Sequence, residues 1–488
     1  MPELANRSIA LDNIMEARGR RWLCFAAIII TIFFAFIVEF NVELPPSLLY
    51  SLSVLALVFL IFKSSSKPAI AIYALAIYIP FSRILVGDFG GNVTALNFTN
   101  VLTIIAILGW VINAALTNQR FYTRTSLDIP LLVFMLLGCL SVLRGTFYFG
   151  TEYGAMVIIP LKRWLTPMIF FFIAFNAVKT KEEVKNLSII IMIVTFAVAL
   201  MAIKDYMDVC NASCLDKARV GGIADQPNVL AAFFVYYMFL FAGFLFVYWR
   251  NVKSWCLFLP FLACFRGIQV TFSRGGYIAF AGAALIFIFF RNKILFVLAT
   301  LLLLFALVNP RFLPDGIRYR MESTFRNRAV FAQSVEDVVD KSSQRRIEAW
   351  KGGIEMMKQS PLFGIGYGLF PYLISNYAPV RSMDAHNMYI LIGAEMGLPA
   401  LVTFFVVLII MLFNTRKLHK MTKDKFFKAL ALGFLGCLGG VFVANIFGGR
   451  LDSQEMSSYF WIISALVMRA LYIERRENRG KACRKKTK

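Results

Sequence analysis

Long apolar runs fill most of the chain, and short polar segments separate them. About 14 of these runs approach the roughly 20 residues that a helix needs to cross a bilayer. They lie near residues 22–40, 47–62, 68–82, 97–116, 129–146, 163–178, 187–204, 229–249, 254–272, 277–290, 294–308, 388–413, 429–447 and 459–473. The third, tenth and eleventh runs are short, so one of them is a candidate interfacial helix. Because only helices and closed barrels satisfy the backbone inside a bilayer, the pattern predicts an all-α polytopic membrane protein.

The polar segments divide the chain into four predicted parts. Residues 1–308 hold the N-terminal membrane helices, and residues 309–387 form one large extracytoplasmic helical loop domain. Residues 388–473 form the C-terminal membrane helices, and residues 474–488 form a basic cytoplasmic tail. The first apolar run is too long for the core of a signal peptide, so we expect it to remain as an uncleaved span.

The composition supports a membrane protein. Hydrophobic residues make up 59% of the chain and charged residues 16%, whereas soluble domains are nearer half apolar and a quarter charged. The formal net charge of +23 raises the question of nucleic-acid binding. However, the basic residues cluster in short segments between apolar runs and in the tail, where they set orientation and meet lipid headgroups. We therefore expect membrane lipid as a partner and no nucleic acid.

The distribution of lysine and arginine predicts the orientation. If the N-terminus is cytoplasmic and the runs alternate, the basic short loops all fall on the cytoplasmic side, including Arg250, Lys253, Arg291 and Lys293. This agrees with the positive-inside rule, so both termini are expected in the cytoplasm. The segment 309–387 then lies outside, since long loops cross regardless of charge.

The cysteines and histidines constrain metal chemistry. Cys210 and Cys214 share one polar loop and are candidates for a disulfide if that loop is outside the cytoplasm. No histidine lies near them, which disfavours a zinc pair. The two histidines, His386 and His419, fall on opposite sides of the predicted membrane, so no histidine-rich metal site is expected. A site built of carboxylates alone stays open.

His386 is the first candidate for chemistry. It lies in the stretch DAHNMYILIGAEMGLP, which closes the long loop and opens an apolar run. Histidine exchanges protons near neutral pH, so this position suits acid–base chemistry at a membrane surface. The alternative is a surface histidine without a role. His419 lies among lysines in a cytoplasmic loop, where we expect it to be solvated.

Four arginines are candidates for binding an anion. Arg219 and Arg274 lie at the predicted outer ends of spans, and Arg345 and Arg346 lie in the long loop. Guanidinium groups bind phosphate oxygens bidentately and stay charged. An arginine cluster at the outer leaflet therefore suits a lipid-linked phosphate or pyrophosphate.

The segment around Arg345 and Arg346 predicts an amphipathic helix, with Ser342 or Ser343 as its cap. An apolar face recurs at helical spacing in Ile347, Trp350, Ile354 and Met357. Two interpretations stay open. The helix lies on the membrane with its arginines among headgroups, or at least one arginine faces an anionic substrate.

Three blocks of sequence resemble the O-antigen ligase and O-antigen polymerase superfamily of bacterial membrane glycosyltransferases. The first is ARVGG…QPNVLAAF with Arg219, and the second is TFSRGG with Arg274. The third is RRIEAWKGGIEMMKQSPLFGIGYGLF, followed by AHNMYILIGAEMGLP with His386. The resemblance covers roughly residues 219–399.

The resemblance implies transfer of a glycan from undecaprenyl pyrophosphate to an acceptor hydroxyl on the outer face of the plasma membrane, without a cofactor and usually without a metal. Polymerases extend a chain on the next lipid-linked repeat, ligases transfer it to lipid A core, and some relatives build teichuronic acid or exopolysaccharide. The span number and long loop favour a polymerase. A ligase stays open, as does a transporter of lipid-linked sugars, although a transporter should carry charges at midplane depth. Other membrane proteins of polysaccharide assembly are candidate partners.

The resemblance also implies roles for the candidate residues. His386 would accept the proton of the acceptor hydroxyl, and Arg219 and Arg274 would neutralise the leaving pyrophosphate. Arg346 or Arg345 would hold donor or acceptor. Asp384 is a candidate to orient the imidazole. For Glu395, in the apolar run that follows, we favour a buried hydrogen bond to a polar backbone neighbour over a catalytic role.

Overall fold

A computed structural model describes residues 22, 25–33, 46–82, 97–209, 219–312, 318 and 340–486, and all regular structure within these ranges is helical. In this part of the chain, nine helices are long and apolar enough to cross a membrane. They are α4 (Phe98–Leu116), α5 (Asp128–Phe149), α6 (Thr151–Ala177), α7 (Lys181–Val209), α8 (Pro227–Val247), α10 (Arg274–Arg291), α16 (Leu398–Met421), α17 (Lys425–Ala444) and α18 (Gln454–Lys486). The prediction of an all-helical protein with many apolar helices is thus confirmed.

Several predicted spans correspond to shorter helices. They are α3 (Ala69–Tyr78), α9 (Phe258–Val270) and α11 (Lys293–Val308), whereas α2 (Pro46–Ser66) has 21 residues where the run near 47–62 was expected. The runs near 68–82 and 294–308 are short, as predicted, whereas the run near 277–290 is extended to the 18 residues of α10. Most of the first run, 22–40, lies outside the described residues.

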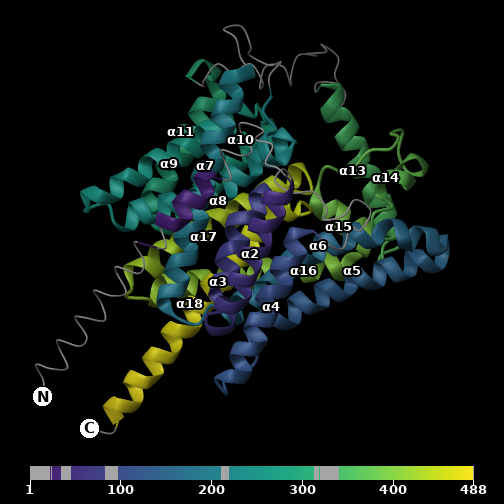
Figure 1. The fold of residues 1–488 in the computed structure, drawn as a ribbon. Helices are drawn as coiled ribbons and strands as arrows, with labels where there is room; N and C mark the ends of the chain where they lie inside the picture. The colour runs from purple at the N-terminus through teal and green to yellow at the C-terminus, as the bar shows by residue number, and fades with distance from the viewer. Residues whose placement is uncertain are drawn as a thin grey trace, which may run out of the picture.

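The centre of the molecule is the contact between α8 and α17 (Figure 1). α8 is apolar on every side, and nearly all of its residues are buried. A β-carbon at Gly243 would lie 2.5 Å from the carbonyl oxygen of Ala429, and one at Gly433 would lie 2.7 Å from the carbonyl oxygen of Phe239. The glycines therefore allow the two backbones to approach closely, as small residues do between membrane helices.

The apolar run predicted as one span over 388–413 is two helices. α15 (Met388–Met396) ends at Gly397, which has φ of +86°, and α16 begins at Leu398 with a proline in its first turn. A β-carbon at Gly397 would lie 2.5 Å from the carbonyl oxygen of Leu362. The prediction of one helix was wrong because apolarity does not reveal a left-handed residue that only glycine adopts readily.

α13 (Lys341–Gln359), α14 (Phe370–Leu373) and α15 lie on the side of the molecule far from the C-terminal end of α18 (Figure 1). They enclose a small core of their own, which contains Ala349, Met356, Phe370, Ile374, Val380, Ala385 and Ala394. The side chain of Asp340 caps α13 by accepting from the backbone N–H of Ser343. The predicted cap, Ser342 or Ser343, was wrong because the helix begins earlier than the serines.

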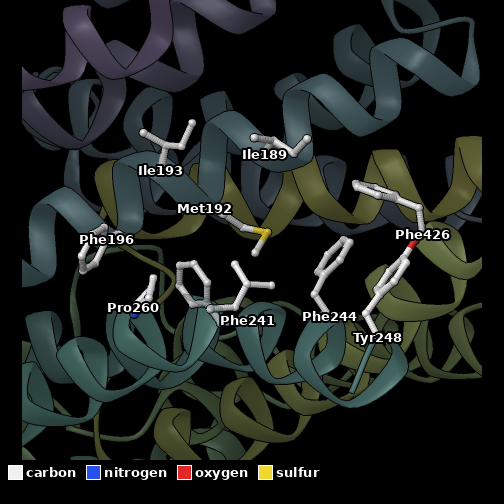
Figure 2. Close-up of a pocket in the computed structure, with 10 residues that line it drawn as sticks. Ile189, Met192, Ile193, Phe196, Phe241, Phe244, Tyr248, Pro260 and Phe426 are labelled. Carbon is white, nitrogen blue, oxygen red and sulfur yellow. The ribbon is translucent and has the colours of Figure 1, made fainter. Parts of the chain in front are cut away.

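An apolar cavity of about 330 Å³ lies between α7, α8 and the start of α9 (Figure 2). Figure 2 shows Ile189, Met192 and Ile193 facing Phe241 and Phe244 across it. The full lining is Ile189, Met192, Ile193, Phe196, Phe241, Phe244, Tyr248, Leu257, Pro260 and Phe426. With no charged side chain in its lining, the cavity offers nothing to bind an anion, so the charged chemistry must be sought elsewhere.

Candidate active site

Arg219 is held by the segment between α9 and α10. Its Nε donates to the carbonyl oxygen of Thr271 at 3.1 Å, and its Nη2 donates to Oδ1 of Asn228 at 3.0 Å. The hydroxyl of Ser273 donates to the same Asn228 oxygen at 2.7 Å and accepts from the N–H of Gly276, which caps α10. Asn228 therefore joins Arg219 to the residue directly before Arg274.

The second arginine of this group, Arg274, forms an ion pair with the cap of α13. Its Nη1 lies 2.9 Å from Oδ2 of Asp340, while Oδ1 of Asp340 accepts from the backbone N–H of Ser343 at 3.0 Å. Partial burial opposes ionisation of Asp340, but the hydrogen bonds from Ser343 and Arg274 together hold its pKa below the usual range. The carboxylate thus ties the α10 end of the site to α13.

Arg346 extends the cluster along α13. Burial and the nearby Arg274 lower the pKa of Arg346, while Asp340 acts in the opposite direction. One carboxylate therefore stands close to two guanidinium groups. Arg345 is exposed and Arg346 is partly buried, which follows from the rotation of about 100° between successive helical residues.

His386 is fixed by the backbone on both sides of it. Nε1 of Trp350 in α13 donates to the carbonyl oxygen of Ala385 at 2.8 Å. On the other side, the Asn387 side chain caps α15 by accepting from the N–H groups of Tyr389 and Ile390. His386 itself has φ of +47°, a conformation that non-glycine residues adopt at a cost of about 1–3 kcal/mol.

The charges around His386 favour the neutral imidazole. Partial burial and the guanidinium groups of Arg346 and Arg450 lower its pKa, and the carboxylate of Asp384 opposes them. Nδ1 of His386 lies 3.9 Å from Oδ2 of Asp384, an ion-pair distance rather than a hydrogen bond. Because the pKa is lowered, the imidazole is free to accept a proton near neutral pH.

Arg450 is a charged residue of this cluster that the sequence analysis missed. It lies between α17 and α18 and is only 8% exposed. Its Nη2 donates to the carbonyl oxygen of Phe447 at 2.7 Å, and its backbone N–H donates to Oδ1 of Asn445 at 3.0 Å. The charges of Arg346, Asp384 and Asp452 all act on it. The sequence contained a clue, since GGRLD forms a short polar segment between the last two apolar runs.

Five described non-glycine residues have positive φ; Asn118 lies just after the end of α4, and the other four, which include Ser382, are close in sequence to the candidate residues. Besides His386, the non-glycine residues Asp225 and Phe272 have φ of +58° and +46°. Asp225 lies between Arg219 and the start of α8, and Phe272 lies two residues before Arg274. Strained conformations persist where the surrounding structure imposes them, often at functional sites. Their placement beside three candidate residues supports a common site.

Glu395 serves the structure around the site. Its side chain is buried, and its Oε1 accepts from the N–H of Phe370 at 3.0 Å, which confirms the expected hydrogen bond to a backbone neighbour. Its carbonyl oxygen accepts from Gly366 in the glycine-rich turn and from the hydroxyl of Ser141 in α5. Glu395 therefore joins the turn, α15 and α5.

His419 is partly buried rather than fully solvated. Its Nδ1 lies 3.2 Å from the carbonyl oxygen of Lys428 and so links α16 to α17. Among the described residues, no group of three or more histidine, cysteine or acidic side chains is arranged to hold a metal. The predicted disulfide pair, Cys210 and Cys214, lies outside the described residues.

Comparison with known proteins relates the part of the chain that contains this cluster to a family. Residues 259–405 match the O-antigen ligase family. The chain contains an O-antigen ligase domain. This finding confirms the resemblance to the O-antigen ligase and polymerase superfamily, whose members are glycosyltransferase-like membrane enzymes. A search of curated proteins found no match to the chain.

The O-antigen ligase domain contains most of the cluster. Arg274, Arg345, Arg346, Asp384 and His386 lie within the matched range. Arg219 precedes the range and Arg450 follows it, yet the structure joins both to the domain through Thr271 and through the charges around His386. The site is therefore assembled from the domain together with helices on either side of it.

Proposed function

We propose that the protein polymerises undecaprenyl-pyrophosphate-linked repeat units into a bacterial surface polysaccharide of the O-antigen, exopolysaccharide or teichuronic acid type. The carrying observation is the continuous arrangement of Arg219, Arg274 and Arg346 that ends at His386 within an O-antigen ligase domain. Such an arrangement suits an anionic leaving group beside a proton acceptor. It requires no cofactor or metal.

The proposed reaction is a single displacement at the anomeric carbon of the donor. Neutral His386 takes the proton of the acceptor hydroxyl as its oxygen forms the new glycosidic bond. The bond between the anomeric carbon and the pyrophosphate breaks, and its electron pair leaves with undecaprenyl pyrophosphate. Arg219, Arg274 and Arg346 stabilise the negative charge of this leaving group, and Asp384 orients the imidazole.

Arg345 is the exposed neighbour of Arg346. We assign it to contact with the donor or acceptor glycan rather than with the leaving group.

We place the site on the extracytoplasmic face and both termini in the cytoplasm, with about 14 spans and the large loop outside. This arrangement satisfies the positive-inside rule. Donor, acceptor and lipid are the partners, and other assembly proteins dock beside them.

Two other functions are distinguished by their products. A ligase would transfer the finished chain to lipid A core, and a transporter would move the lipid-linked sugar without a chemical step. The charged cluster lies at the start of α10, in the second turn of α13 and in the segments that join helices. This location favours chemistry at a surface over passage through the membrane.

Analysis of lipid-linked glycans in a deletion strain tests the proposal. Loss of a polymerase leaves single repeat units, loss of a ligase leaves long lipid-linked chains, and loss of a transporter changes the leaflet of the precursor. When the deletion strain is complemented with His386→Ala, polymerisation should be slower by a factor of about 10²–10⁴, the usual contribution of a general base. His419→Ala is the matched control, and normal polymer from His386→Ala would contradict the base.

A further inference from the structure

Asp340 is an acidic residue among the arginines of the proposed donor site. Its two carboxylate oxygens have different partners. Oδ2 lies 2.9 Å from Nη1 of Arg274, and Oδ1 accepts from the N–H of Ser343 at 3.0 Å. The same carboxylate acts electrostatically on Arg346. An anion of this chain therefore stands where the arginines would receive an anion of the substrate.

We propose that Asp340 is a resident counterion that holds Arg274 until the donor pyrophosphate displaces it, and so sets donor affinity. The inference rests on the proposed use of a pyrophosphate-linked donor. Arg274 and Arg346 repel each other, since Arg274 lowers the pKa of Arg346. A carboxylate near both guanidinium groups relieves that repulsion while no donor is bound.

Pyrophosphate competes well for such a position. It carries more charge than a carboxylate, and arginine binds phosphate oxygens through parallel hydrogen bonds. Solvent reaches the ion pair that it must replace, because the Arg274 and Asp340 side chains keep 28% and 27% of their exposure. Water screens an ion pair that it reaches, so such a pair contributes little to stability. The pair is therefore strong enough to order the empty site and weak enough to open.

Asparagine at position 340 separates the two functions of the carboxylate. Asp340→Asn removes the charge, yet asparagine caps helices as well as aspartate does. The cap on α13 should therefore persist, and thermal unfolding of the purified protein verifies this. An effect on binding would then come from the lost counterion and not from a lost helix.

The experiment measures binding of undecaprenyl pyrophosphate to the purified full chain in detergent. Asp340→Asn should tighten binding by up to about five-fold, the factor that corresponds to the energy of an ion pair that solvent reaches. The gain should shrink at high salt, which screens surface charges. In an Arg274→Gln background, Asp340→Asn should have a smaller effect, since the residue that Asp340 holds is gone.

Glu355→Gln provides the matched control. Glu355 is another acid of α13, and its carboxylate pairs with Lys358 at 2.6 Å. Glu355→Gln should leave binding unchanged. If it tightens binding as much as Asp340→Asn does, the effect comes from net charge and the proposal is overturned. Unchanged or weaker binding by Asp340→Asn would also overturn it, as would failure of the parent protein to bind the probe.

Glycan transfer is measured separately in the same preparations. Absence of transfer with the expected change in binding would refute the proposed function and leave the role of Asp340 intact. Normal transfer by the parent with no gain in binding for Asp340→Asn would refute the role of Asp340 alone.

Discussion

At the scale of single residues, His386 depends on neighbours from three parts of the chain. Asp384 is close in sequence, Arg346 comes from α13, and Arg450 comes from the segment between α17 and α18. The sequence identified His386, Asp384 and Arg346 because a lone histidine and paired arginines are conspicuous in a chain of low charge. It missed Arg450 and Asp340, because the role of a charged residue depends on the groups that folding places beside it.

The first prediction concerns the pH dependence of transfer. As a base, His386 must be neutral, so activity should fall below its pKa. Asp384→Asn removes a charge that raises this pKa, and the acidic limb should move to lower pH. Arg450→Gln removes a charge that lowers it, and the limb should move to higher pH.

Rates measured across the pH range, with Glu355→Gln as a control that leaves the limb in place, test these opposite shifts. If the acidic limb of Asp384→Asn moves to higher pH, the carboxylate does not act on the base through its charge.

The second prediction concerns Glu395. Burial raises its pKa to about 8, from an ordinary value of 4.5. The folded state keeps a proton that the unfolded chain releases, so this group makes the protein less stable as pH rises from 4.5 to about 8. Glu395→Gln keeps an acceptor for the N–H of Phe370 and cannot ionise.

In thermal unfolding, the stability of Glu395→Gln relative to the parent should therefore be greater at pH 8 than at pH 5. Glu395→Ala loses the acceptor and should cost about 1–3 kcal/mol. Loss of transfer by Glu395→Gln in a stably folded protein would assign Glu395 to the chemistry instead.

At the scale of elements, α13 links the arginines to the histidine. Asp340 begins the helix, Arg346 lies in its second turn, and Trp350 holds the backbone next to His386. The sequence predicted this helix from its apolar spacing and left open whether its arginines meet lipid or substrate. The structure brings Arg346 into the cluster, because the helix packs on α14 and α15 through the face that carries Ala349 and Met356. The predicted apolar face was wrong in part, since Ile354 is 45% exposed.

The third prediction tests this link. Trp350→Phe removes the hydrogen bond to the carbonyl oxygen of Ala385, a fully buried residue, and should cost about 1–3 kcal/mol. The rate of transfer should fall because His386 loses a support, while the acidic limb of the pH profile stays in place.

Trp255→Phe is the matched control. Nε1 of Trp255 also donates to a carbonyl oxygen, that of Trp249 at 3.1 Å, but Trp255 is exposed. Water replaces the lost bond there, so stability should change little. Equal losses in both variants would mean that the Trp350 bond has no special role.

At the scale of the whole molecule, the positions of the apolar helices along the chain follow from hydropathy, and the orientation is a prediction from charge. The long helix α18 illustrates the difference. Its 33 residues span about 50 Å, more than the roughly 30 Å of a bilayer core, and its polar end coincides with the predicted basic tail. The apolar part is a candidate span, and the basic part extends beyond it (Figure 1).

The fourth prediction tests the orientation. In a chain without other cysteines, Lys358→Cys in α13 should react with a membrane-impermeant maleimide in intact cells. Lys423→Cys, between α16 and α17, should react only after permeabilisation. Both lysines are exposed, so access to the thiol depends on the side of the membrane. The reverse pattern would place the cluster in the cytoplasm.

The sequence by itself determined the helical class, the positions of most apolar helices and the identity of the histidine and arginines, because hydropathy and residue chemistry are local properties. Only the tertiary structure decided that α15 and α16 are separate, that Asp340 holds Arg274, and that Arg450 acts on His386. Each of these depends on a backbone angle or on a contact between segments far apart in the chain, and a linear pattern contains neither.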